Sequence, residues 1–137
     1  MLAQNFMTPA DLGLNDRQFD ALVKTLKLLE TNKLRHAMAP AYRFEIWPAD
    51  CSFDGLFNMA TWISGSACGT VACIGGTACL LAGDELLFHN AEPEPAALDT
   101  LFFPPLERGK ITTEQAARAL RSYLTTGDPR WTEAVAC

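Results

Sequence analysis

Three cysteines, Cys68, Cys73 and Cys79, lie close together in a stretch that carries no charged residue from Gly55 to Gly83. A thiolate serves both as a metal ligand and as a nucleophile, so the spacing of these cysteines decides which chemistry is open to them. Four and five residues separate them, whereas paired cysteines of structural zinc sites usually have about two to four between them. On a helix, Cys68 and Cys73 would point about 140° apart, and Cys79 would lie roughly 16 Å along the axis from Cys68. We therefore expect buried thiols and no bound metal, unless the helix begins after Cys73.

Cys68 allows a second hypothesis, that of a catalytic nucleophile. The residues from Ser66 to Gly69 lead into an apolar segment, which places Cys68 near the start of the expected helix. Backbone N–H groups and the helix dipole at such a position lower a thiol pKa and can stabilise an oxyanion. The mechanism also needs a base, and the chain contains only His36 and His89. His36 can approach the helix start more easily, so the alternative function is a cysteine-nucleophile hydrolase that uses Cys68 and His36.

The uncharged stretch itself favours a helix from Cys68 to Ala82 that ends at the following glycine. The adjacent glycines Gly75 and Gly76 lie inside this helix and cost on the order of 1 kcal/mol each relative to alanine. That cost indicates close packing, so we expect a buried central helix with Trp47 and Trp62 covering one end.

The same stretch is long enough to be tested as a membrane span. It contains six glycines, counting both ends, and its hydropathy is modest. Its flanks are acidic, with Asp54 before it and Asp84 and Glu85 after it, and no basic residue would orient it in a bilayer. We therefore expect a soluble helix and no membrane contact.

Two other segments carry the capping-box pattern, in which a polar cap residue is followed three positions later by glutamine. In both, apolar residues then recur at helical spacing while charged residues occupy the opposite face. The two predicted helices run from the cap Asn15, with Gln18, to about Thr31, and from the cap Thr112, with Gln115, to the stop Gly127.

The remaining segments are less regular. Residues 33–57 contain two prolines, and alternation around the second allows a short β-hairpin near residues 43–54. A short helix is expected between Pro95 and Pro104. No repeat or linker divides the 137 residues, so the predicted fold is mainly α, a single compact domain, residues 1–137, around the buried central helix.

Charge and cysteine content limit the classes of function. The net charge of −5 and the lack of any basic cluster argue against nucleic-acid binding. The N-terminal residues carry no secretory signal, and five cysteines are an odd number. We therefore expect reduced thiols and a cytoplasmic location.

Large apolar residues near loop ends raise the possibility of a protein partner. Phe102, Phe103 and Trp131 lie close to predicted helix boundaries, where exposure would mark an interaction surface. We favour a noncatalytic protein-interaction module over the Cys68 hydrolase, with no cofactor. The sequence also allows a homo-oligomer.

Four segments follow one another in a distinctive order: Phe57–Trp62, Cys68–Gly76, Leu101–Pro104 and Ile111–Leu120. In this they resemble a group of small uncharacterised proteins from bacteria and their phages that carry a CGTxACIxG-type core. The likeness covers roughly residues 57–131. After Gly76, where such relatives would have His or Trp, this chain has Thr77. The resemblance implies no activity and bears on the fold more than on function.

Overall fold

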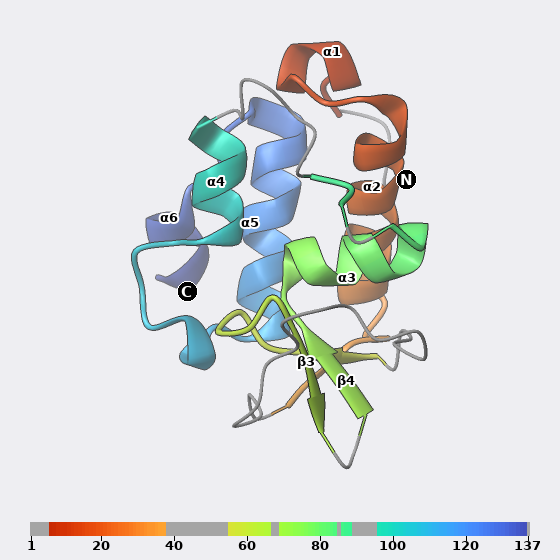
Figure 1. Ribbon diagram of the computed structural model, residues 1–137. Helices are drawn as coiled ribbons and strands as arrows, with labels where there is room; N and C mark the ends of the chain where they lie inside the picture. The colour runs from red at the N-terminus through yellow and green to blue at the C-terminus, as the bar shows by residue number, and fades with distance from the viewer. Residues whose placement is uncertain (1–5, 38–54, 67–68, 85, 89–95, 137) are drawn as a thin grey trace.

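A computed structural model describes residues 6–37, 55–66, 69–84, 86–88 and 96–136. These residues form one mainly α domain, in which the long helices stand side by side and a small sheet closes one end (Figure 1). The elements are α1 (Pro9–Leu12), α2 (Asp16–Glu30), β1 (Arg35–His36), β2 (Leu56–Phe57), β3 (Ile63–Ser66), β4 (Gly69–Ala72), α3 (Ile74–Ala82), α4 (Ala96–Phe102), the 3-10 helix η1 (Arg108–Lys110), α5 (Thr113–Thr126) and α6 (Trp131–Val135).

The two capping boxes form as predicted and fix the starts of α2 and α5. Asn15 accepts the backbone N–H of Gln18 at 2.8 Å, and the Gln18 side chain accepts the Asn15 N–H at 2.9 Å. Thr112 and Gln115 make the equivalent reciprocal pair at α5. Each helix buries one apolar face, and the two faces pack against each other in the core.

An ion pair joins α2 to α5 on the outer side of that packing. Arg121 donates two hydrogen bonds of 2.6 Å to the two carboxylate oxygens of Glu30. The Arg121 guanidinium also lies 5.8 Å from the centre of the Phe6 ring. The Glu30 hydrogen bonds raise the pKa of Arg121 above its ordinary value.

The sheet was not expected from the sequence. Its strand order is β1-β2-β4-β3, with β1, β2 and β4 parallel and β3 antiparallel to β4. The prediction of a helix from residue 68 was wrong, because residues 69–72 form β4 and pair with both β2 and β3. Short buried strands and buried helices share the same apolar composition, so composition alone did not separate them. The expected hairpin near residues 43–54 lies outside the described residues.

The central helix α3 is shorter than expected but is buried as predicted. It begins at Ile74, with Cys73 at the N-cap position, and ends at Gly83, which adopts the left-handed conformation with φ 66°. Figure 1 shows α3 crossing the lower parts of α2 and α5, with β3 and β4 below it. Every residue from Ile74 to Cys79 is buried.

Trp62 explains the two glycines in α3. A Cβ atom at Gly75 would overlap the Trp62 indole ring, and one at Gly76 would overlap the Trp62 backbone carbonyl. The close packing inferred from these glycines is therefore confirmed, as is the prediction that Trp62 covers one end of the helix. Trp47, its expected companion, lies outside the described residues.

Candidate functional site

Cys73 and Cys79 are buried, and neither is joined in a disulfide. Burial raises the pKa of Cys73 to about 11, although hydrogen bonds from the backbone of Gly76 and Gly75 and the charge of Arg108 act in the opposite direction. A thiol with this pKa is almost entirely protonated at neutral pH and is a poor nucleophile. Its N-cap position on α3 therefore does not activate it.

Cys68 lies outside the described residues. The next residue, Gly69, opens β4, so the chain after Cys68 enters a strand and not the helix on which the nucleophile hypothesis depended. His36 is exposed at the end of β1, and its Nε2 atom lies 3.1 Å from the carbonyl oxygen of Gly109. In the sheet, His36 pairs with Phe57, and Phe57 pairs with Ala72. Ala72 is the last residue of β4, whereas Gly69, which follows Cys68, is the first. The sheet therefore places His36 level with the end of β4 that is farther from Cys68 in the sequence.

Metal binding finds no support in the part of the chain that the structure describes. Within it, no group of three or more His, Cys, Asp or Glu side chains is arranged to hold an ion. The helix does begin after Cys73, the condition under which a cysteine cluster remained open, and Cys73 and Cys79 are both buried in the hydrophobic core.

The three residues expected to form an interaction surface have different environments. Phe102 and Trp131 are buried, with 1% and 4% of their surface exposed, and the Trp131 Nε1 atom donates a 2.9 Å hydrogen bond to the Thr100 carbonyl. These two side chains belong to the core because α4 and α6 both turn their apolar faces toward α5. Phe103 is 47% exposed, so it alone of the three offers a large apolar side chain to a partner.

Phe103 is held in a fixed aromatic arrangement. Its ring stacks on Trp62 with centroids 5.8 Å apart and an interplanar angle of 22°. The Arg108 guanidinium lies over the same ring, 5.9 Å from its centre. Trp62 is in turn fixed edge-on against buried Phe102, with centroids 5.2 Å apart. We call Phe103, Trp62 and Arg108 the aromatic platform.

The platform is assembled from three separate parts of the chain. Phe103 follows the last residue of α4, Trp62 precedes β3, and Arg108 opens η1. The backbone of Trp62 is fixed by the Cys73 N–H, which donates to its carbonyl at 3.3 Å. The contact between His36 and Gly109 ties η1 to the edge strand β1. Sequence reasoning found Phe103 but missed Arg108, since nothing in a Glu-Arg-Gly-Lys loop indicates a ring beneath it.

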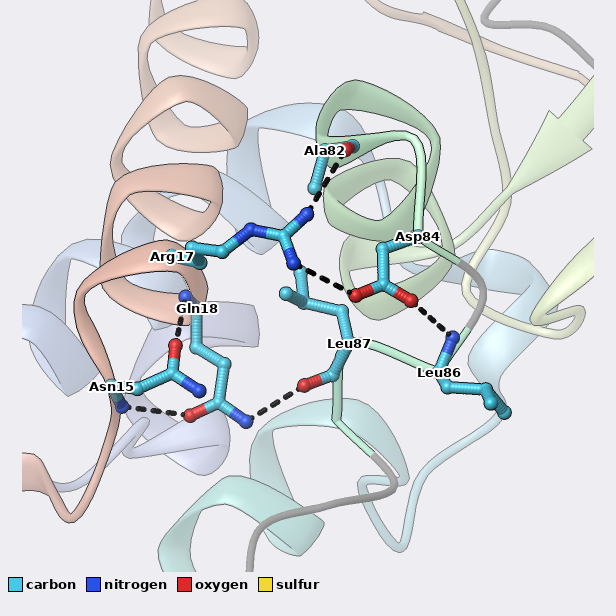
Figure 2. Close-up of polar contacts among 7 residues, drawn as sticks. All are labelled: Asn15, Arg17, Gln18, Ala82, Asp84, Leu86 and Leu87. Carbon is cyan, nitrogen blue, oxygen red and sulfur yellow. Dashed lines mark hydrogen bonds and ion pairs between the residues drawn. The ribbon is translucent and has the colours of Figure 1, made fainter.

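Leu86 is the other large hydrophobic residue that is well exposed among the described residues, at 49%. Its surroundings differ from those of Phe103, because the nearby polar groups satisfy one another (Figure 2). Arg17 donates to the Asp84 carboxylate at 3.1 Å, and the second Asp84 oxygen accepts the Leu86 N–H at 3.0 Å. Gln18 reaches the Leu87 carbonyl at 2.8 Å. These contacts fasten α2 to the turn after α3, so this region serves the fold.

Shallow hollows lined by described residues open on the surface at these two places. One, of about 220 Å³, lies between α2 and α3, and its rim carries the internally paired Asp20 and Lys24. The other, of about 400 Å³, is lined by the apolar side chains of Leu106 and Trp131 and by the charged residues Arg130 and Glu133. Neither brings together the nucleophile, base and oxyanion donors that a hydrolytic site requires.

Comparisons of the chain with protein-family models, with curated proteins and with solved structures found no match. The resemblance to the CGTxACIxG group therefore stays a prediction. Among the helices that the structure describes, none is both long enough and apolar enough to cross a bilayer.

Proposed function

We propose that this protein is a noncatalytic protein-interaction module that binds its partner through the aromatic platform. The observation that carries the proposal is the position of Phe103, which is 47% exposed yet held by Trp62 and Arg108. Aromatic and arginine side chains supply much of the binding energy at protein interfaces. A ring that is already fixed loses little conformational entropy when a partner covers it.

The chemistry of the described thiols supports a noncatalytic role. Cys73 and Cys79 are buried, and the raised pKa of Cys73 keeps it protonated at neutral pH. Buried cysteines that are not joined in a disulfide are also typical of proteins in a reducing compartment. On that ground we propose a cytoplasmic location.

Site-specific photo-crosslinking in the host cells tests the proposal. A benzophenone amino acid replaces Phe103 in one variant and Leu86 in another, so that the two well-exposed apolar positions are compared directly. We expect a discrete protein adduct from position 103 and none from position 86. No adduct at 103, or the same adducts from both positions, would contradict the proposal.

A matched pair of substitutions controls for loss of folding. Phe103→Glu and Leu86→Glu place the same charge at equally exposed positions, so both should melt within a few degrees of the unmodified protein. Competition by the unmodified protein should suppress the adduct, competition by Phe103→Glu should not, and Leu86→Glu should behave like the unmodified protein. An adduct made of two copies of this chain would assign the platform to self-association.

A further inference from the structure

We infer that the partner segment that docks on the aromatic platform is acidic, with a carboxylate next to an apolar side chain. This inference rests on the proposed interaction function and names the chemistry of the partner. Its basis is the distribution of charge around Phe103, which differs from that of the rest of the molecule.

Cations gather on the edge of the domain that carries the platform. Lys33 lies two residues before the edge strand β1, and Arg35 is the first residue of that strand. Arg108 and Lys110 are the first and last residues of η1. The 3.1 Å contact between His36 and Gly109 joins these two short segments. We call Lys33, Arg35, Arg108 and Lys110 the basic edge; all four residues are exposed. The chain as a whole carries a net charge of −5, so this edge is opposite in sign to the molecule.

Most of the basic edge is not neutralised by the described part of the chain. Among the described residues, Lys33, Arg35 and Arg108 form no ion pair, whereas Lys110 pairs with Glu107 at 2.8 Å. The Lys110–Glu107 pair is highly exposed, with 82% and 75% of the two side chains accessible, and such pairs are weak and easily exchanged. Glu30 lies three residues before Lys33 and is already paired with Arg121. Glu114 lies in the first turn of α5, four residues after Lys110. A partner carboxylate would therefore meet little competition from the carboxylates that the structure describes.

Arg108 links the two parts of the surface because it touches both. Its guanidinium lies over Phe103, and its N–H groups can still donate to a carboxylate in the forked geometry that arginine favours. An apolar side chain of the partner would cover the Phe103 ring while the adjacent carboxylate binds Arg108. A nucleic acid is the less suitable polyanion, because the acidic remainder of the molecule would repel an extended phosphate backbone.

Selection from a random peptide library displayed on phage, with the complete chain as bait, tests the inference. Phe103→Glu serves for counter-selection, so that only peptides that need the platform are kept. We expect these peptides to be enriched in Asp and Glu beside Leu, Phe or Trp. For a synthetic peptide from the selection, Arg108→Glu should weaken binding about tenfold or more, which corresponds to about 1.4 kcal/mol.

Lys27→Glu provides the matched control, since Lys27 is an exposed cation on α2 that forms no ion pair among the described residues. It makes the same change in net charge as Arg108→Glu but lies outside the basic edge, so it should leave the affinity within about twofold. Raising the salt concentration should weaken the peptide's binding to the unmodified protein. It should weaken binding to Arg108→Glu less steeply, because that variant keeps only three cations of the basic edge.

The outcomes separate the inference from the function on which it rests. Peptides that need Phe103 but show no acidic enrichment would overturn the inference and leave the interaction function standing. Recovery of no Phe103-dependent peptide would overturn both. A fluorescent single-stranded oligonucleotide that binds more tightly than the selected peptides, and loses affinity with Arg108→Glu, would reassign the surface to nucleic acid.

Discussion

The backbone carbonyl of Trp62 lies against Gly76 so closely that there is no room for a Cβ atom, and the same carbonyl accepts the Cys73 N–H at 3.3 Å. This contact fixes the start of α3 to Trp62, the residue directly before β3. It also fixes Trp62, on which the Phe103 ring is stacked. The close packing of Gly76 against Trp62 therefore helps to position Phe103 on the proposed binding surface.

Gly76→Ala should destabilise the protein strongly. Alanine would gain about 1 kcal/mol in helix propensity, but the overlap with backbone atoms should cost more, and we expect a net loss of about 2–4 kcal/mol in the free energy of unfolding. Urea denaturation measures this loss. Gly109→Ala is the control, because its Cβ would meet only the Ala60 Cβ at 3.8 Å, and it should change stability by less than about 0.5 kcal/mol. Equal effects of the two substitutions would refute the packing argument.

Tyr123→Phe should leave the protein as stable as before or make it more stable. Tyr123 is 1% exposed, and its hydroxyl has no hydrogen-bond partner among the described residues. A buried polar group without a partner costs about 1–3 kcal/mol, so its removal with the ring retained should raise the free energy of unfolding by up to about 1 kcal/mol. Thermal and urea unfolding provide the measurement. A loss of more than about 1 kcal/mol would mean that the hydroxyl has a partner.

Stability should fall in alkali in a way that depends on Cys73. Burial raises the pKa of this thiol from 9.0 to about 11, so above pH 9 the unfolded chain releases the proton while the folded protein retains it. The contribution is fully present below pH 9 and is lost as the pH rises toward 11, at up to about 1.4 kcal/mol per pH unit. Cys73→Ala should show a shallower fall than the unmodified protein over this range. Parallel curves would contradict the burial of the thiol.

Arg121 and Glu30 should stabilise the contact between α2 and α5 by a measurable amount. The bidentate hydrogen bonds and partial burial favour this pair over an exposed one. We expect a coupling energy of about 0.5–1.5 kcal/mol in a double-mutant cycle with alanine. The exposed Lys24–Asp20 pair of α2 is the comparison and should couple by no more than about 0.5 kcal/mol. A smaller coupling for Arg121 and Glu30 than for the exposed pair would be the contrary result.

Thiol labelling should distinguish the described cysteines from a catalytic one. Cys73 and Cys79 are buried, so iodoacetamide at neutral pH should modify them only slowly in the folded protein and rapidly after denaturation. Peptide mass spectrometry assigns each modified position. Rapid labelling of Cys73 in the folded state would contradict its burial. Rapid labelling of Cys68 near pH 6 would instead revive the hydrolase alternative.

The amino-acid sequence was sufficient for features that depend on neighbours along the chain. The capping boxes at Asn15 and Thr112 and the helix stops at Gly83 and Gly127 are local, because a side chain or a backbone angle satisfies groups within a few residues. The burial of α3 was also predictable, since adjacent glycines without charged neighbours imply a close approach of other atoms.

The tertiary structure alone decided the features that depend on distant partners. Residues 69–72 are a strand because β2 and β3 supply hydrogen bonds on both sides. Gly69 and Ala72 do not themselves favour a strand, since glycine and alanine are depleted in strands. Phe102 is buried and Phe103 is exposed because the end of α4 packs against α5 on one side only. Arg108 reaches Phe103 through the fold of the intervening loop. Such contacts join segments that are distant in the sequence, so no local sequence pattern predicts them.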